Sequence, residues 1–327
     1  MTTESTTAES TTAQTDASRW GELAGVTLSK GHGTGNDFLL LTDPEGSLEL
    51  EGDLVAAVCD RHRGIGADGL IRAIRSQHLE AGRALAANGE DAPEWFMDYR
   101  NADGSLSEMC GNGVRVFAHH LIHAGLIELP EGETVRIGTR GGVKTVARVP
   151  GGYAVDMGPW GFIDGEQARE HGADCTVSAR GLRTARPGLS ITMGNPHTVV
   201  ALADEAKLAR LDLGTAPTVD PRPSAGTNVE FVVPRDAEEE DDGTGALVLR
   251  VSERGVGETL SCGTGACAAA AATRFWGGED APDEWRVGVP GGELGVTFVL
   301  GPDELEHVIL SGPVSYTHLT LPTIYSV

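Results

Sequence analysis

Basic residues are scarce in this chain, and their scarcity argues against a nucleic-acid-binding surface. The 327 residues include 25 Lys and Arg against 48 Asp and Glu, which gives a formal net charge of -23. Proteins that grip phosphate backbones ordinarily carry a basic face, and no stretch rich in Lys and Arg occurs here. We therefore expect no nucleic-acid partner and no binding to anionic membranes. The acidic run 238–242 is more typical of a solvated loop than of a metal site.

Long apolar segments and paired cysteines are also missing. No stretch approaches the roughly 20 apolar residues of a membrane-spanning helix, so no membrane partner is expected. Residues 1–24 carry neither a basic start nor an apolar segment, and we predict a disordered N-terminal extension without an export signal. The five cysteines are widely spaced and lack a CxxC motif, which argues against a disulfide framework or a zinc ribbon. A cytoplasmic protein without a metal is expected.

Cofactor signatures are absent as well. Neither a GxGxxG fingerprint in a strand–helix frame nor a Walker A lysine occurs, which argues against a nucleotide site. Pyridoxal phosphate needs a Schiff-base lysine, and the only lysines are Lys30, Lys144 and Lys207. None of the three lies beside a motif that resembles a phosphate cup. We therefore predict that the protein works without a cofactor.

The chain does contain an internal repeat. The motif CGNG at 110–113 recurs as CGTG at 262–265, and a run of small residues typical of a helix follows each copy. Upstream, Asn36 lies 74 residues before Cys110, and Asn195 lies 67 residues before Cys262. Segments with period-two alternation, such as 134–137, 152–157 and 246–251, predict strands around both copies. The repeat predicts two homologous α/β halves.

A cysteine at a glycine turn that leads into a helix is suited to proton transfer. The helix N-terminus carries partial positive charge, which should lower the pKa of the thiol, and its free N–H groups can bind a carboxylate. Inverting a carbon centre requires a base on one face and an acid on the other. Two such turns in symmetric halves would supply both groups. We predict that Cys110 and Cys262 are the opposed acid and base of an amino-acid epimerase.

Six motifs, taken together and in order, resemble the diaminopimelate epimerase family over roughly residues 25–313. They are KGHGTGNDF (30–38), NADG (101–104), MCGNG (109–113), GNPH (194–197), NVEF (228–231) and ERGVGETLSCGTG (253–265). The resemblance implies a cofactor-independent interconversion of LL-2,6-diaminopimelate and meso-diaminopimelate, which feeds lysine and peptidoglycan synthesis. It also implies a small-molecule amino-acid partner and leaves a homodimer open.

The family's site residues carry over onto these motifs. Cys110 and Cys262 match the catalytic pair, and His197 matches a supporting residue near the reacting centre. The positions that match substrate contacts are Asn36, Asn101, Gly111, Asn112, Asn195, Asn228, Glu253, Arg254, Gly263 and Thr264. Arg254 suits a distal carboxylate because a guanidinium group can grip it through two parallel hydrogen bonds.

The resemblance implies an α/β (α+β) fold of two pseudo-symmetric domains, with the active site in the interdomain cleft. Each domain is expected to be a mixed or antiparallel sheet wrapped around a central helix. We place the first domain at 25–153 plus 307–314 and the second at 154–306. Two features depart from the family. Gly69 stands where some relatives have glutamine, and 315–327 is an atypical C-terminal tail without charge.

Three other functions remain to be distinguished. A racemase of another amino acid, such as proline, would use the same two thiols but would need no grip on a second amino-acid head. A non-catalytic relative that binds small molecules would not need both cysteines, and both are intact. A dithiol redox protein would usually place its cysteines close in sequence, unlike Cys110 and Cys262.

Overall fold

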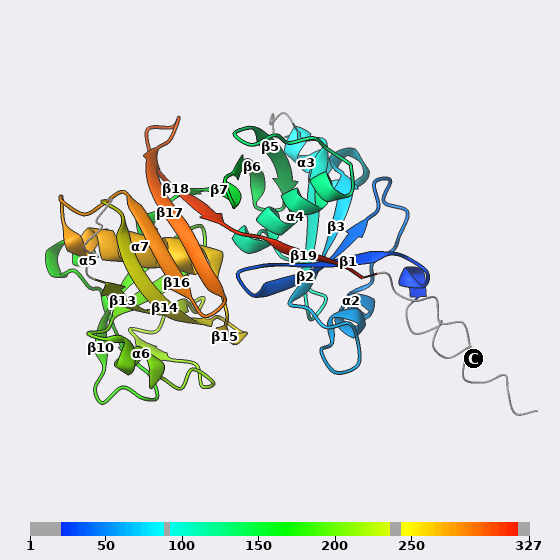
Figure 1. Ribbon diagram of the computed structural model, residues 1–327. Helices are drawn as coiled ribbons and strands as arrows, with labels where there is room; N and C mark the ends of the chain where they lie inside the picture. Colours follow the sequence, from blue (N-terminus) through cyan, green and yellow to red (C-terminus); the bar gives the residue numbers. More distant parts are fainter. Residues whose placement is uncertain (1–20, 88–91, 236–242, 320–327) are drawn as a thin grey trace, which may run out of the picture.

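The computed structural model describes residues 21–87, 92–235 and 243–319. Its first half is a mixed sheet in the spatial order β1-β2-β3-β4-β5-β6-β7 (Figure 1). The β2–β3 and β4–β5 pairs are parallel, and the other neighbours are antiparallel. The strands are β1 (Leu28–Gly33), β2 (Asn36–Thr42), β3 (Gly69–Arg75), β4 (Trp95–Asn101), β5 (Thr134–Thr139), β6 (Gly142–Val149) and β7 (Gly152–Pro159).

The second half repeats this arrangement strand by strand. Its order is β10-β11-β13-β14-β16-β17-β18, again with the second and fourth pairs parallel. The strands are β10 (Arg186–Thr192), β11 (Pro196–Ala201), β13 (Asn228–Arg235), β14 (Gly245–Glu253), β16 (Glu284–Val289), β17 (Gly292–Leu300) and β18 (Glu306–Gly312). The predicted pseudo-symmetry is therefore confirmed at the level of topology.

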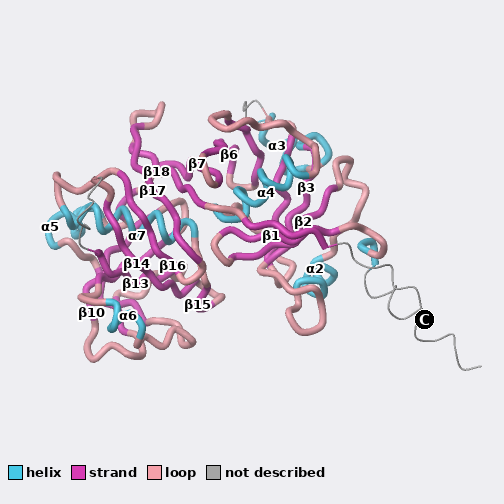
Figure 2. The backbone as a smooth tube through the Cα atoms, in the orientation of Figure 1, coloured by secondary structure: helices cyan, strands magenta, loops and turns pink. Residues whose placement is uncertain are grey.

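A buried helix lies inside each half. Helix α4 (Gly111–His123) follows β4 and packs on the strands of the first half, whereas α7 (Gly263–Gly277) follows β14 and packs on those of the second (Figure 2). In α7 the residues 268–272 are all alanine and all buried. Alanine has the highest helix propensity, and its small side chain lets the surrounding strands approach closely. The predicted fold, a sheet wrapped around a central helix in each half, is confirmed.

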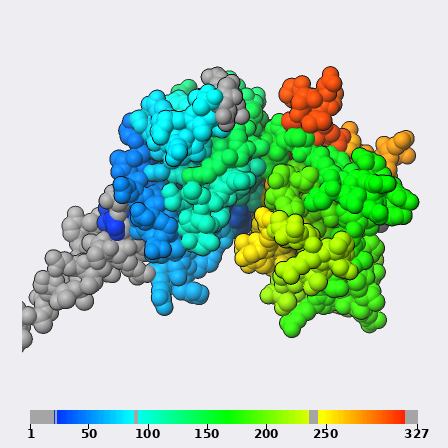
Figure 3. All heavy atoms as spheres, turned by 180° about the vertical axis from the view of Figure 1, so that it is seen from behind, coloured from blue at the N-terminus to red at the C-terminus, as the bar shows by residue number. Residues whose placement is uncertain are grey.

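The two halves share one continuous set of hydrogen-bonded strands. Strand β18 pairs with β17 on one side and with β7 on the other, so it joins the second half to the first. The predicted boundary between residues 153 and 154 falls inside β7, and the domain limits stay a prediction. Seen from behind, the halves form two lobes side by side (Figure 3).

Shorter elements complete the structure. They are η1 (Gly21–Leu23), α2 (Gly52–Cys59), η2 (Ser76–His78), α3 (Glu80–Ala87), β8 (Gly161–Phe162), α5 (Gly165–His171), β9 (Cys175–Ser178), α6 (Glu205–Ala209), β12 (Thr218–Asp220), β15 (Gly257–Thr259) and β19 (Ser315–Leu319). None of the helices in the described ranges has the length and apolar character needed to cross a membrane.

The structure corrects one expectation at the N-terminus. Residues Gly21–Leu23 form a 3-10 turn, and Leu23 is buried against Leu28 and its neighbours, so the predicted disordered extension does not reach residue 24. Burial of this apolar side chain is what orders the turn. At the other end, β19 pairs antiparallel with β1. Residues 1–20, the acidic run 238–242 and residues 320–327 lie outside the described residues.

Candidate active site

The two repeated cysteines occupy equivalent places at the starts of the two central helices. Cys110 is the N-cap of α4 and Cys262 is the N-cap of α7, both with extended backbone. The turns touch each other, because a Cβ built on Gly263 would lie 3.4 Å from the Cα of Gly111. The positive ends of both helix dipoles therefore converge on one place.

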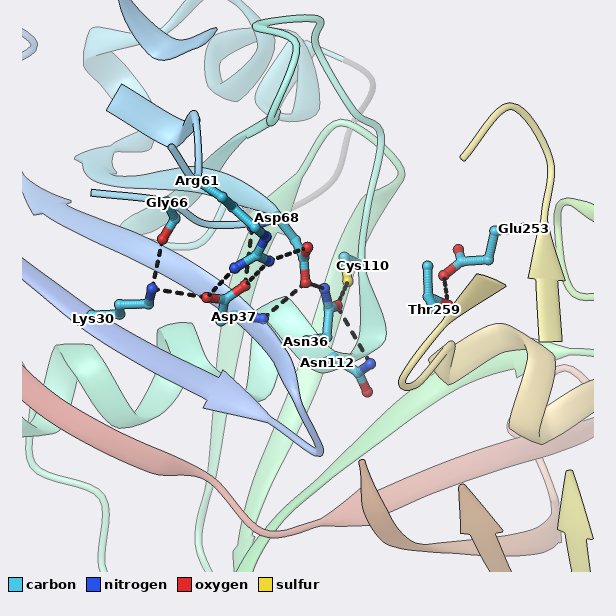
Figure 4. Close-up of polar contacts among 10 residues, drawn as sticks. All are labelled: Lys30, Asn36, Asp37, Arg61, Gly66, Asp68, Cys110, Asn112, Glu253 and Thr259. Carbon is cyan, nitrogen blue, oxygen red and sulfur yellow. Dashed lines mark hydrogen bonds and ion pairs between the residues drawn. The ribbon is translucent and has the colours of Figure 1, made fainter. Parts of the chain in front are cut away.

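In the first half, Asn36 faces the thiol. The Cys110 Sγ donates to Asn36 Oδ1 at 3.5 Å and accepts from the Gly113 N–H at 3.4 Å. The Asn36 Nδ2 donates to Asp68 Oδ2 at 2.7 Å, which fixes the orientation of the amide (Figure 4). Because Asp68 takes the amide nitrogen, the carbonyl oxygen of Asn36 is the atom that faces the sulfur.

An ion-pair cluster supports this arrangement from behind. Arg61 bonds both Asp37 and Asp68, and Lys30 lies 2.9 Å from Asp37 (Figure 4). Burial alone would raise the pKa of Asp37, but hydrogen bonds from Arg61 and Lys30 lower it to about 2. Asp37 is therefore ionised at neutral pH, and it anchors the loop that carries Asp68.

In the second half, a longer chain of polar contacts leads to the thiol. The Cys262 Sγ lies 3.6 Å from Thr264 Oγ1, to which Asn195 Nδ2 donates at 3.4 Å. The Asn195 Oδ1 lies 3.1 Å from His197 Nε2, and His197 Nδ1 lies 2.7 Å from Glu230 Oε1. Both His197 and Glu230 are 0% exposed. The contacts thus connect a buried carboxyl group to the sulfur.

Asn112 ties the two halves together beside the thiols. Its Nδ2 donates to the Ser261 backbone oxygen at 3.3 Å and to the Ser261 hydroxyl at 3.1 Å, and it also lies 3.4 Å from Asn36 Oδ1. Its Oδ1 accepts from the buried Arg115 at 3.1 Å. The residue before Cys262 is thereby held against the turn that contains Cys110.

Burial dominates the acidity of both thiols. It raises the pKa of Cys110 to about 11, and it raises the pKa of Cys262 well above its usual value, with Glu253 and Glu230 adding to the effect. The N–H groups of Asn112 and Gly113 at the start of α4 lower the pKa of Cys110, as predicted for a helix N-terminus, but burial raises it by more. The cost of desolvating a thiolate outweighs the stabilisation that the helix dipole provides.

The remaining predicted contacts lie at strand ends around the same place. Asn101 ends β4 and Glu253 ends β14, so they occupy equivalent positions in the repeat. Asn228 begins β13, and its Oδ1 accepts from the Arg254 backbone N–H at 2.9 Å. The Arg254 guanidinium is exposed and donates to Ala225 O at 2.8 Å. Burial raises the pKa of Glu253, which accepts a hydrogen bond from Thr259.

A cavity of about 840 Å³ opens between the halves; of the predicted site residues, Asn36 lines it, whereas Cys110 and Cys262 do not. The first half lines it with Asn36 and Asp68, and the second half lines it with Thr259, Leu260 and Ser261. The volume is ample for an amino-acid substrate, since small-molecule pockets typically measure about 300–1,000 Å³. Within the described ranges, no group of three or more His, Cys, Asp or Glu side chains is placed to hold a metal ion.

Three polar residues of the second half, Glu230, Thr259 and Ser261, were not among the predicted site residues. Glu230 lies within the NVEF motif, two positions after Asn228, so strand alternation puts both side chains on one face of β13. The two-residue spacing between Asn228 and Glu230 could therefore have identified Glu230 from the sequence. Ser261 and Thr259 gave no comparable signal, because their roles depend on contacts across the fold.

Comparison with known sequences identifies close relatives. The family model described as "Diaminopimelate epimerase" matches residues 28–163 and 189–315. The diaminopimelate epimerase of Streptomyces coelicolor is 45% identical over 280 residues, which are 83% of this chain and 88% of the relative. The diaminopimelate epimerase of Thermobifida fusca is 44% identical over 288 residues, which are 88% of this chain and 94% of the relative.

Solved structures share the fold at low sequence identity. A phenazine biosynthesis protein of the PhzF family from Bacillus anthracis matches with a TM-score of 0.59 and 13% identity, over 90% of this chain and 99% of that one. A hydroxyproline epimerase from Agrobacterium vitis, with bound trans-4-hydroxy-L-proline, matches with a TM-score of 0.54 and 14% identity, over 91% and 93%.

Proposed function

The chain belongs to the diaminopimelate epimerase family, and from that premise we propose that this isomerase interconverts LL-2,6-diaminopimelate and meso-diaminopimelate through two opposed thiols. Its curated relatives carry that name at 44–45% identity over most of both chains. The observation that best supports the two-thiol mechanism is the contact between Gly111 and Gly263, which places both helix N-caps at one site.

The reaction moves one proton across the α-carbon. The thiolate of Cys110 or Cys262 takes the α-proton from one face, and the thiol of the other donates its proton to the opposite face. The sulfur that began as a thiolate ends as a thiol, and the other ends as a thiolate. A raised pKa favours this step, because a thiolate of high pKa is a stronger base toward a weakly acidic C–H bond.

The substrate carboxylate at the reacting end binds between the two turns. The N–H groups of Gly111, Asn112, Gly263 and Thr264 lie in the first turns of α4 and α7. Groups at a helix N-terminus bind anions through free N–H donors and the helix dipole. Two such termini also stabilise the negative charge that spreads onto the carboxylate when the α-proton leaves.

The far amino-acid head is held by the polar residues at the strand ends. Arg254 binds the distal carboxylate, and Asn101, Asn228 and Glu253 bind the ammonium group and the carboxylate oxygens. Asn36 and Asn195 flank the reacting centre, with His197 in support. The position of Asn228 against the backbone of Arg254 supports this grouping.

A racemase of a one-headed amino acid is the second candidate, and the comparisons do not favour it. The similarity to a hydroxyproline epimerase is 14% in sequence and concerns the fold alone. Incubation with LL-diaminopimelate, L-alanine and L-proline in parallel distinguishes the two. We expect conversion of diaminopimelate to the meso form and no turnover of the others. Equal turnover of proline would contradict the proposal.

Two further attributes are predictions from the family resemblance. A cytoplasmic location and a homodimer are both expected, and light scattering on the purified chain tests the second. A mass close to that of one 34.1 kDa chain would contradict the homodimer.

A further inference from the structure

The two halves differ in chemistry at equivalent positions beneath their thiols. Strands β2 and β3 pair in parallel with Phe38 opposite Gly69, and β11 and β13 pair in the same way with His197 opposite Asn228. Phe38 therefore corresponds to His197. Ile71 lies two residues after Gly69 on β3, and Glu230 lies two residues after Asn228 on β13. Ile71 therefore corresponds to Glu230.

The Glu230 carboxyl lies directly under the turn of Cys262. A Cβ built on Gly265 would lie 2.8 Å from Glu230 Oε1, so any larger residue there would displace the carboxyl group. Within the described part of the chain, Glu230 Oε2 has no hydrogen-bond partner, and Oε1 is hydrogen-bonded to the side chain of His197. Burying a carboxyl group with so few partners costs free energy, and burial raises the pKa of Glu230.

The pair of Glu230 and His197 fixes one orientation of the Asn195 amide. Burial raises the pKa of Glu230 and disfavours a net negative charge on this pair, so the pair carries two protons: one lies between Glu230 Oε1 and His197 Nδ1, and the other stays on Nε2. That N–H donates to Asn195 Oδ1. The amide nitrogen of Asn195 must then point away from His197, and it donates to Thr264 Oγ1.

We propose that Glu230 is a positioning residue that, acting through His197, orients the Asn195 amide. Because Thr264 Oγ1 accepts from Asn195, its hydroxyl proton is directed at the Cys262 sulfur. Cys262 thus has a hydrogen-bond donor beside it. The inference rests on the proposed function, because it assigns a polar environment to one of the two proposed acid–base thiols.

In the first half, the equivalent residue Asn36 has the opposite amide orientation with respect to its thiol. Asp68 accepts from the Asn36 amide nitrogen, so the carbonyl oxygen faces Cys110 and accepts from its thiol. A donor stabilises a thiolate, whereas an acceptor stabilises a thiol. The two sulfurs therefore differ in the side-chain group that the equivalent asparagine places beside them, an amide oxygen at Cys110 and the Thr264 hydroxyl at Cys262.

Thiol alkylation measured residue by residue tests the role of Glu230. The full-length chain is treated with iodoacetamide between about pH 8 and pH 12, because the pKa values of both thiols are raised, and each site is quantified by peptide mass spectrometry. In the Glu230→Gln variant, Asn195 is free to turn its carbonyl toward the Thr264 hydroxyl. The alkylation midpoint of Cys262 is expected to rise by about one pH unit, since its sulfur loses a donor.

Other titratable groups face Cys262, and the design separates them from the orientation effect. Glu253 on β14 and the pair of His197 and Glu230 are the charged or titratable neighbours. Loss of a negative charge at Glu230 would lower the midpoint of Cys262. A lower midpoint therefore means that Glu230 acts by charge alone, and an unchanged midpoint means that it is not connected to the thiol. Either result overturns the proposal.

Two further variants complete the test. Glu230→Leu gives the second half an aliphatic residue like that of the first, and the midpoint of Cys262 should rise as it does in Glu230→Gln. Ile71→Val changes the equivalent position in the first half and should leave the midpoints of Cys110 and Cys262 unchanged. Alkylation needs no turnover, so a wild-type chain that fails to epimerise diaminopimelate would count against the proposed function and not against this inference.

Discussion

The acidity of the two thiols is set by burial more than by their helix termini. A pKa of about 11 for Cys110 means that the free enzyme holds this thiol protonated at neutral pH. The working base is therefore a minor thiolate form. The polar groups around each sulfur add to or offset the effect of burial on its pKa.

The dependence of kcat/KM on pH should reflect the raised pKa values of the two thiols. Burial disfavours the thiolate, so the pKa goes up, and the active ionised form becomes commoner as pH increases. We expect kcat/KM for diaminopimelate to rise between about pH 6 and pH 9, by up to about tenfold per unit in the steepest part. A profile that is already flat below about pH 7 would show that the base thiol has a lowered pKa instead.

A substitution at Arg254 tests whether the substrate has a second amino-acid head that this side chain binds. An ammonium group cannot reproduce the paired hydrogen bonds of a guanidinium. Arg254→Lys should raise KM for diaminopimelate by roughly tenfold or more. Arg235→Lys is a matched control, because Arg235 is exposed and pairs with Glu205 away from the site. Equal KM values for both variants would remove Arg254 from the substrate contacts.

The site residues that could be predicted from the repeat are those in motifs that occur in both halves. Site residues without a counterpart in the other half were missed. Cys110 and Cys262, like Asn36 and Asn195, appear twice in the same order, which marked them before any coordinates. Glu230 has no counterpart in the first half, and a single glutamate in a strand is ordinarily a surface residue. Its burial follows from how β13 packs beneath α7, which a linear pattern does not contain.

At the scale of secondary structure, a buried ion pair holds two strands of the first half together. Asp98 on β4 is 0% exposed and accepts from Arg72 on β3 at 2.6 Å, while Arg140 bonds its other oxygen. Burial alone would raise the pKa of Asp98, but the two arginines hold it below its usual value. The carboxylate therefore contributes stability above about pH 4, and that contribution is lost as pH falls through the folded pKa.

Asp98→Ala removes the buried carboxylate that Arg72 and Arg140 share, and it leaves Arg72 with only the longer ion pair to Asp43. We expect the free energy of unfolding to fall by about 3–5 kcal/mol, measured by urea denaturation at neutral pH. Removing Asp212, which is exposed and pairs with Arg180, should change it by less than about 1 kcal/mol. Equal losses in the two variants would mean that burial does not strengthen the pair.

Several strands and both central helices could be predicted from the sequence. The alternating segments around 134–137, 152–157 and 246–251 are strands β5, β7 and β14. The helices begin earlier than the small-residue runs indicated, directly at the glycines after each cysteine. Glycine has poor helix propensity, and the start of α4 is instead supported by the Cys110 N-cap and by the contact between the two turns.

At the scale of the whole molecule, the halves are joined by main-chain hydrogen bonds. The β7–β18 pairing makes the sheet continuous, and Asn112 bonds Ser261 across the same junction. The domain limits expected from the sequence, 25–153 plus 307–314 and 154–306, group the segment of β18 with the first half, and they stay a prediction. The partner of β7 is a strand about 150 residues away in sequence.

This continuity predicts that the halves unfold together. Trp95 lies in the first half and Trp285 in the second, and both are buried. With fluorinated tryptophan, fluorine NMR follows each residue separately through a urea titration. We expect coincident midpoints, as in a single cooperative transition. Midpoints that differ clearly would show two independently folding units.

The central claim is that Cys110 and Cys262 act on opposite faces of one α-carbon. Incubation with LL-diaminopimelate in D2O tests it most directly, with α-hydrogen exchange followed by mass spectrometry and configuration followed by chiral chromatography. The wild-type chain should form meso-diaminopimelate carrying one solvent deuterium. Cys110→Ala and Cys262→Ala should each slow inversion by about a thousandfold while keeping the fold, and Cys175→Ala should not. Near-normal inversion in either of the first two variants would contradict the account.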